Sequence, residues 1–212
     1  MNKKILYHTL FKYIPTFISL ILHPLIMPTL GIYIILTSSG TSAYMLEGQD
    51  KFFILTLVAA FTYIIPLAFL PFFYYFKISA TLALQNRQQR IIPLIVTATL
   101  FYLCFMIFRM KGAPHLIQSF LLASSLGVFC SLLVTLRWQI STHMIGIGGI
   151  IGLLLALDLL YHIETTGYLM VSLLLGGIIS FARLSLDAHT PKQVYAGLLL
   201  GFFLTLLVIF LY

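Results

Sequence analysis

Charged residues are scarce in this chain. They make up 8% of its 212 residues, whereas hydrophobic residues make up 61%, and the mean hydropathy is +1.07. No water-soluble domain of this length has such a composition, so the sequence predicts an integral membrane protein. Cysteine is scarce as well. Cys104 and Cys130 both fall within apolar runs, where a small core residue is a better interpretation than a disulfide.

Segments of alternating polarity are missing too. Only helices and closed barrels satisfy backbone polar groups inside a bilayer, and barrel strands alternate over about ten residues. The apolar runs here are continuous, and about 20 apolar residues cross the hydrocarbon core. We therefore predict an all-α polytopic transmembrane bundle of six to seven spans, in a single integral membrane domain, 1–212. The predicted spans are 16–37, 52–76, 91–109, 114–136, 143–161, 167–182 and 194–212.

Proline and glycine mark two features of this bundle. His23, Pro24 and Pro28 would kink or break the first span. The pairs Gly148-xxx-Gly152 and Gly197-xxx-Gly201 are of the small-residue type that lets two helices approach closely, which predicts packing within the bundle.

Acidic residues are few, with 5 Asp and Glu against 12 Lys and Arg. The basic residues are spread over the loops instead of forming a basic domain, so we expect anionic lipids and phosphate groups as partners, and no nucleic acid. We expect an integral multi-pass protein of the bacterial inner membrane. Loop charges favour a cytoplasmic site if seven segments cross, but a first segment that does not cross would reverse the orientation, so the membrane side stays open.

Three polar clusters stand before predicted spans three, five and seven: 85–93, 139–143 and 183–193. An even number of crossings separates each cluster from the next, so all three emerge on the same face of the membrane. Polar and charged side chains are costly at a membrane boundary, and such residues are functional candidates. The clusters are therefore expected to build one site.

The third cluster carries a resemblance. Arg183 precedes His189 by six positions, and Val194, Ala196 and Gly197 follow at the start of the last apolar run. This pattern resembles the last motif of the type 2 phosphatidic acid phosphatase (PAP2-like) family, and the resemblance is best over 137–212. It implies that His189 attacks phosphorus and forms a phosphohistidine, while Arg183 binds the phosphate oxygens. Those residue types suit the roles.

The other two clusters match the family in part. Ser141 and His143 occupy the family's phosphate-binding and proton-donating positions, and Arg90, with Arg87, occupies its first basic motif. By resemblance, His143 is the second catalytic residue and the other three bind phosphate. The residues alone allow plainer interpretations: Ser141 as the N-cap of a helix with an interfacial His143, and the arginines as a loop that obeys the positive-inside rule.

Gln193 stands where the family has an aspartate that orients the nucleophilic histidine, and Ala182 stands where it has a serine. Gln193 would orient His189 through its carbonyl, and Asp187 is an alternative partner from the other side. Thr190, Pro191 and Gln193 also fit a capping box at the start of the last helix. That structural role is compatible with a site, since a helix N-terminus attracts anions.

Three functions follow as hypotheses. The first is a membrane-embedded phosphatase or phosphotransferase that acts on a lipid phosphate or prenyl pyrophosphate, without metal or other cofactor. The second is a degenerate relative that binds a phosphorylated lipid without hydrolysing it, so enzyme activity stays open. The third is a transporter that uses Asp158, interpreted as a carboxylate deep in the fifth span. The oligomeric state is not predicted.

Overall fold

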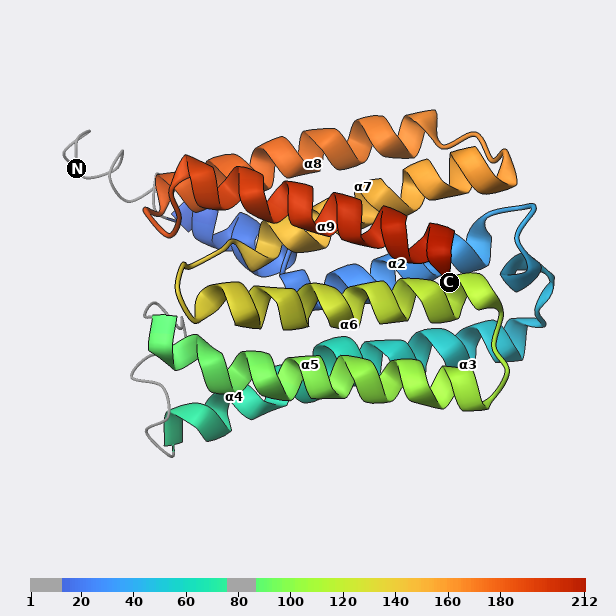
Figure 1. Ribbon diagram of the computed structural model, residues 1–212, viewed down its shortest axis with the longest axis horizontal. Helices are drawn as coiled ribbons and strands as arrows, with labels where there is room; N and C mark the ends of the chain where they lie inside the picture. Colours follow the sequence, from blue (N-terminus) through green and yellow to red (C-terminus); the bar gives the residue numbers. More distant parts are fainter. Residues whose placement is uncertain (1–12, 76–86) are drawn as a thin grey trace.

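A computed structural model describes residues 13–75 and 87–212 of the chain. Its elements are helices, and no strand occurs in these two ranges. Seven helical segments there are long and apolar enough to cross a membrane, and they lie roughly side by side along the long axis (Figure 1). The chain is an integral multi-pass membrane protein, and the predicted all-α bundle is confirmed.

The spans lie close to where hydropathy predicts them. The first comprises a helix over 13–21 and α2 (Met27–Thr37), and the second comprises α3 (Gly48–Ala59), a π-helical stretch (Ala60–Ile64) and α4 (Ile65–Tyr75). The other five are α5 (Arg87–Met110), α6 (His115–Thr135), α7 (Thr142–Tyr161), α8 (Thr166–Ser185) and α9 (Pro191–Leu211). The sixth span, predicted to be short, gains residues at both ends and reaches full length.

The first span is interrupted, as its prolines predict. The helix over 13–21 ends before His23, which has an extended backbone with φ −64° and ψ 137°. A single 3-10 turn, Pro24–Ile26, then leads into α2, where Pro28 occupies the first turn. Proline is tolerated in such first-turn positions because its missing N–H has no helical partner there. The chain therefore presents non-helical backbone inside the bundle.

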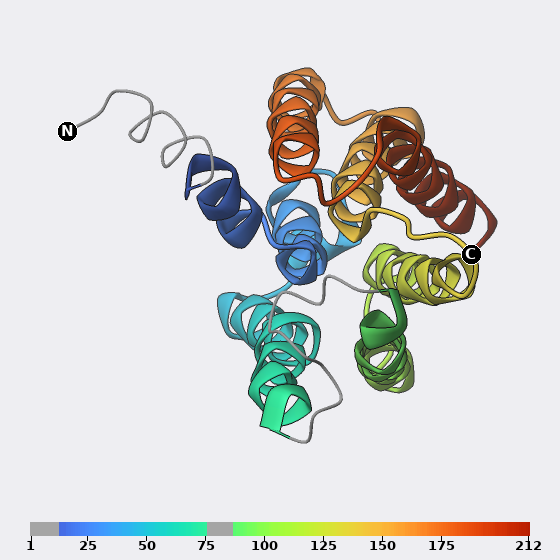
Figure 2. The same cartoon turned by 90° about the vertical axis from the view of Figure 1, so that its left-hand side faces the viewer.

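The best enclosed span is α7. It packs against α2, α6, α8 and α9, and buried side chains occur along its whole length. Seen from the end, α2 lies near the middle of the bundle, with α3 and α4 on one side of it and α7 on the other (Figure 2). The residues at the start of α7 are therefore surrounded by protein and not by lipid.

The glycine pairs bring α7 and α9 into backbone contact. A Cβ atom at Gly148 would meet the Leu198 carbonyl group, and one at Gly201 would meet the carbonyl group of Ile145. At Gly152 a Cβ would lie 2.6 Å from the Phe202 carbonyl oxygen. No side chain fits in such gaps, so the predicted packing role of both pairs is confirmed.

Gly201→Ala is expected to destabilise the bundle by about 1–3 kcal/mol, because the added methyl group must push the α7 backbone away. The matched control is Gly177→Ala on α8, where a Cβ meets nothing within 4 Å and where alanine favours the helix by about 1 kcal/mol. Thermal unfolding in detergent measures both effects. Equal stability of the two variants would contradict this interpretation of the interface.

Candidate functional site

The three polar clusters meet at one end of the bundle, the end that faces the viewer in Figure 2. There α5, α7 and α9 begin and α8 ends. Arg90 in the first turn of α5, Gln139 just before α7 and Arg183 in the last turn of α8 line one cavity. Residues far apart in the sequence thus share one site, as their position on a common membrane face predicts.

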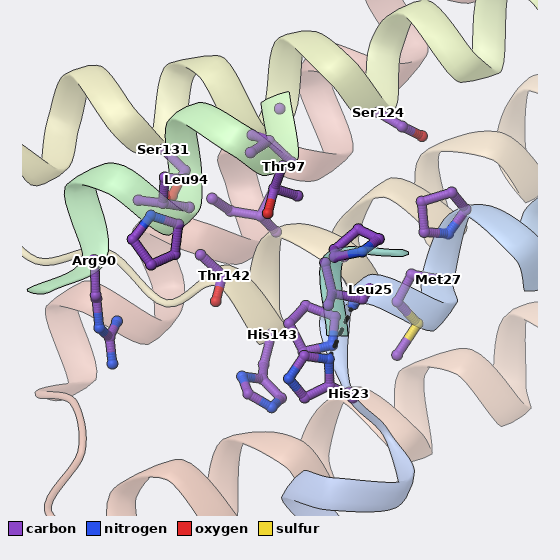
Figure 3. Close-up of a pocket in the computed structure, with 18 of the residues that line it drawn as sticks. His23, Leu25, Met27, Arg90, Leu94, Thr97, Ser124, Ser131, Thr142 and His143 are labelled. Atoms are coloured by element: carbon purple, nitrogen blue, oxygen red, sulfur yellow. Dashed lines mark hydrogen bonds between the residues drawn. The ribbon is translucent and has the colours of Figure 1, made fainter. Parts of the chain in front are cut away.

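This cavity has a volume of about 920 Å³, within the range of small-molecule binding sites. The polar residues that line it include Ser19, His23, Arg90, Gln139, His143 and Arg183. The rest of the wall is mostly apolar and includes Leu67 and Leu70 of α4, Leu94 of α5 and Phe120 of α6. Figure 3 shows the His23 and His143 rings close together, with Met27 and Ser124 on the side away from Arg90. The cavity therefore has arginine side chains on part of its wall, whereas the rest of the wall is mostly apolar.

His189 lies next to this cavity, in the loop between α8 and α9. It lines a smaller pocket of about 520 Å³ together with Gln193, while Gln139, Asp187 and Ala188 line both pockets. His189 itself is 6% exposed. The two pockets thus adjoin and share part of their wall, including Gln139.

The hydrogen bonds around Gln193 fix which nitrogen of His189 carries the proton. The backbone N–H of Thr190 donates to Gln193 Oε1 at 2.9 Å, so the atom facing it must be the amide oxygen. The same Oε1 lies 3.2 Å from His189 Nδ1. Because an amide oxygen only accepts, Nδ1 must carry the hydrogen. In the neutral ring the lone pair is then on Nε2, which is buried and has no hydrogen-bond partner in the described part of the chain.

Gln193 therefore does two things at once. It closes the capping box of α9, with Thr190 as N-cap and Pro191 in the first turn, and it orients His189. The alternative partner, Asp187, is exposed and has φ +49°. Its N–H donates to the carbonyl of Leu184, which is a backbone role at the end of α8.

Burial lowers the pKa of His189 from 6.5 to about 4, and the charges of Arg90 and Arg183 add to this effect, while the hydrogen bond to Gln193 opposes it. Desolvation disfavours the charged imidazolium, and two nearby cations disfavour it further. His189 is consequently neutral at physiological pH, the state in which an imidazole is a nucleophile.

Arg183 is placed by the turn that ends α8. The N–H of Ala188 donates to the Arg183 carbonyl at 3.2 Å, which with the Asp187 bond forms a Schellman motif and reverses the chain toward His189. The guanidinium donates from Nη1 to Ser19 Oγ at 3.4 Å. Its Nε is buried with no hydrogen-bond partner among the described residues. The described chain thus leaves one donor of Arg183 unsatisfied.

Arg90 and Gln139, which both line the cavity, form a hydrogen-bonded pair. With the amide oxygen of Gln139 turned toward the guanidinium, it accepts from Nη1 at 3.3 Å and from Nη2 at 3.2 Å. Arg87 is the first residue of α5, and its side chain lies outside the described part of the structure, as do residues 85 and 86.

The start of α7 agrees with the sequence in part. Ser141 is the N-cap residue, but its hydroxyl makes no capping bond, is fully buried and lines neither pocket. Its N–H instead donates to the carbonyl of Gln193 at 3.4 Å. His143 lines the large cavity, and its Nε2 lies 3.1 Å from the Ser19 carbonyl oxygen. Ser141 is therefore a backbone link between α7 and α9, whereas His143 can meet a ligand.

Sequence reasoning missed Ser19 and His23. The sequence predicts for His23 only a part in the break of the first span, whereas in the structure it lines the cavity and its ring forms a T-shaped contact with His143, with centroids 5.8 Å apart. The break at His23, Pro24 and Pro28 was the available signal, because a broken span inside a bundle commonly lines a site.

The interpretation of Asp158 as a deep intramembrane carboxylate is wrong. Asp158 is exposed in the last turn of α7, just before His162 adopts the left-handed conformation that ends the helix. It lies at the end of α7 away from His143. A transporter hypothesis built on a buried Asp158 has no structural basis.

The chain matched no protein-family model, no curated protein and no solved structure. The resemblance to the PAP2-like phosphatases therefore depends on the residues themselves. Among the described residues, no three His, Cys, Asp or Glu side chains are grouped so that they could hold a metal ion.

The environment of His189 predicts that its imidazole titrates near pH 4, with Nδ1 protonated in the neutral form. Between pH 6.5 and about 4 the unfolded chain binds a proton that the folded chain does not, so stability contributed by the neutral ring is lost as pH falls through this window. NMR of protein labelled with ¹⁵N-histidine, in detergent, measures the pKa and the tautomer of His189. The signal of His189 is assigned as the one missing from His189→Gln. Titration at pH 6.5 or above would contradict the arrangement.

Proposed function

We propose that the protein is a membrane-embedded phosphatase or phosphotransferase that acts on a lipid phosphate or prenyl pyrophosphate through a phosphohistidine at His189. The observation that carries the proposal is the Nε2 atom of His189. It is neutral, buried and without a hydrogen-bond partner among the described residues, and two guanidinium groups lie near it. A nucleophile prepared in this way beside Arg90 and Arg183 suits a phosphorus centre that carries negative oxygens.

The two pockets suggest how the substrate binds. The hydrocarbon tail of the substrate occupies the apolar part of the large cavity. The head group lies where this cavity adjoins the His189 pocket. We propose that a phosphate that meets both arginines and His189 displaces the Gln139 amide from Arg90, because Gln139 lines both pockets and accepts from this guanidinium. Phosphate oxygens then replace the amide oxygen as the acceptor.

The reaction has two displacements. A phosphate monoanion first gives its proton to Nδ1 of the neutral His143. The lone pair of His189 Nε2 then attacks phosphorus, the bond from phosphorus to the lipid oxygen breaks, and that oxygen takes this proton from His143. Water then attacks the phosphohistidine, returns a proton to His143 and releases phosphate with neutral His189. Since the Ser19 carbonyl accepts from His143 Nε2, Nδ1 is the atom that exchanges the proton. In a phosphotransferase, an acceptor hydroxyl takes the place of water.

A second candidate is a protein that binds a phosphorylated lipid without turnover. Gln193 favours it, because an amide fixes the tautomer of His189 but brings no negative charge to a ring that becomes positive on phosphorylation. Loss of an analogous carboxylate from a serine protease triad costs about 10⁴ in turnover.

We propose the bacterial inner membrane as the location of the protein under either candidate function. Proteins of the inner membrane span it with apolar helices, whereas the bacterial outer membrane is spanned by β-barrels. The seven apolar segments support that placement.

Phosphate release from purified protein in detergent tests the proposal, with phosphatidic acid, phosphatidylglycerol phosphate and undecaprenyl pyrophosphate as substrates. Wild type is expected to release phosphate from at least one of them, and His189→Gln to release none, because the nucleophile is gone. His115→Ala is the control, since His115 is an exposed histidine at the start of α6, on the opposite end of the bundle. Release that persists in His189→Gln would overturn the phosphohistidine mechanism.

Gln193→Asp separates the two candidates. If wild type releases no phosphate and Gln193→Asp does, the wild-type site binds the head group and lacks only a negative charge next to His189. If both release phosphate, the aspartate variant is expected to be faster, because its carboxylate stabilises the positive ring. No release by either protein, with tight binding of the lipid, would favour the binding function.

A further inference from the structure

The break in the first span brings a short stretch of irregular chain to the cationic wall of the cavity. Ser19 lies in the last turn of the helix over 13–21 and is 8% exposed. His23 follows in extended conformation, ahead of the turn Pro24–Ile26. Both line the cavity that Arg90, His143 and Arg183 share. None of the three phosphatase-like clusters contains either residue.

Ser19 contacts two residues of the site through different atoms. Its carbonyl oxygen lies 3.1 Å from His143 Nε2, and its hydroxyl accepts from Arg183 Nη1 at 3.4 Å. A carbonyl only accepts, so the contact places the hydrogen of His143 on Nε2 and leaves Nδ1 for the cavity. One residue of the first span therefore orients side chains that belong to α7 and to α8.

His23 contributes a ring whose tautomer is also determined. Its Nδ1 accepts from the N–H of Leu25 at 3.4 Å, so the neutral ring carries its hydrogen on Nε2. The ring is inclined at 71° to that of His143. Figure 3 shows the two imidazoles together in the cavity, on a side distinct from Arg90. The His143 ring is thus held between a carbonyl at Nε2 and the edge of a second imidazole.

We infer that Ser19 and His23 are positioning residues of the head-group site, with Ser19 aiming Arg183 and His23 holding the ring of His143 in the orientation that exposes Nδ1 to the substrate. This inference rests on the proposed function of the site, and it adds the broken first span to the machinery. Without that span, Arg183 would lose an acceptor that directs its guanidinium, and His143 would be free to rotate.

The test uses binding as well as turnover. Dodecyl phosphate serves as a single-chain phosphomonoester, and Trp138, which is the single tryptophan of the chain and precedes Gln139, reports binding by fluorescence. Ser19→Ala is expected to weaken binding about tenfold, because it removes one hydrogen bond to a charged group. Ser19→Thr keeps a hydroxyl and is expected to restore it. Ile21→Ala, at an exposed neighbour, is the control.

For His23 the informative variant is His23→Asn. Asparagine retains an acceptor for the Leu25 N–H and is a good N-cap residue, but it has no ring to hold His143. If His23 only caps the turn, His23→Asn behaves as wild type and the inference is wrong for this residue. If it positions His143, His23→Asn is expected to lower the rate of phosphate release about tenfold, and in the double variant with His143→Ala it adds no further loss.

The outcomes separate this inference from the function on which it rests. Binding that depends on Arg183, as shown by Arg183→Ala, but is unchanged in Ser19→Ala and His23→Asn would leave the proposed function standing and overturn the positioning roles. A wild-type protein that neither binds dodecyl phosphate nor releases phosphate would overturn both. Unfolding temperatures of all variants show whether a loss reflects the site or the fold.

Discussion

The backbone contact between α7 and α9 is the constraint on which the site depends. Gly197 faces the carbonyl oxygen of Ser141, where a Cβ would lie 2.6 Å away, and the N–H of Ser141 donates to the carbonyl of Gln193. These contacts bring the first residues of two spans together. Since His143 follows Ser141 and His189 precedes α9, the glycines determine how close the two imidazoles are. In a membrane, small residues make such close packing possible because lipid supplies no hydrophobic drive between helices.

Charge is the second constraint. Two arginines and two histidines line the main cavity, and among the described residues that line it the acidic one is Asp187, which is exposed. Buried cations are costly when their donors are not all satisfied, and the Nε donor of Arg183, which shares the cavity wall with Arg90, is buried without a hydrogen-bond partner in the described chain. A structure that keeps such groups together is suited to an anion that is not part of the chain. The rest of the wall is mostly apolar, which supports the proposal of an anion with a hydrocarbon tail as the ligand.

The sequence predicted the bundle well because one physical length governs it. A bilayer of nearly constant thickness requires about 20 apolar residues per span, so all seven segments are visible as hydropathy runs. Arg90, His143, Arg183 and Gln193 were also within reach, because charged or polar side chains at a membrane boundary stand out against an apolar background. Ser19 did not stand out, since its contact with His143 uses a backbone carbonyl that every residue has. Asp158 was misplaced although the predicted span ends at 161, as α7 does, because hydropathy locates a span but not the face of the helix that packs inside the bundle.

Gln193 distinguishes the two candidate functions, phosphatase and lipid-binding protein. Its hydrogen bonds show which property an aspartate at this position would change. Its Oε1 already accepts from Thr190 N–H and from His189 Nδ1, so an aspartate at this position would have the same two donors to serve. The tautomer of His189, and with it the lone pair on Nε2, is therefore the same with either residue. What the amide lacks is charge, and in the proposed mechanism charge matters when phosphorylation makes the ring positive beside Arg90 and Arg183. The head group binds before His189 becomes positively charged, whereas turnover requires the positively charged phosphohistidine. The substitution thus acts on the rate of phosphoryl transfer far more than on the affinity for a phosphorylated lipid, which is why binding and turnover must be measured on the same protein.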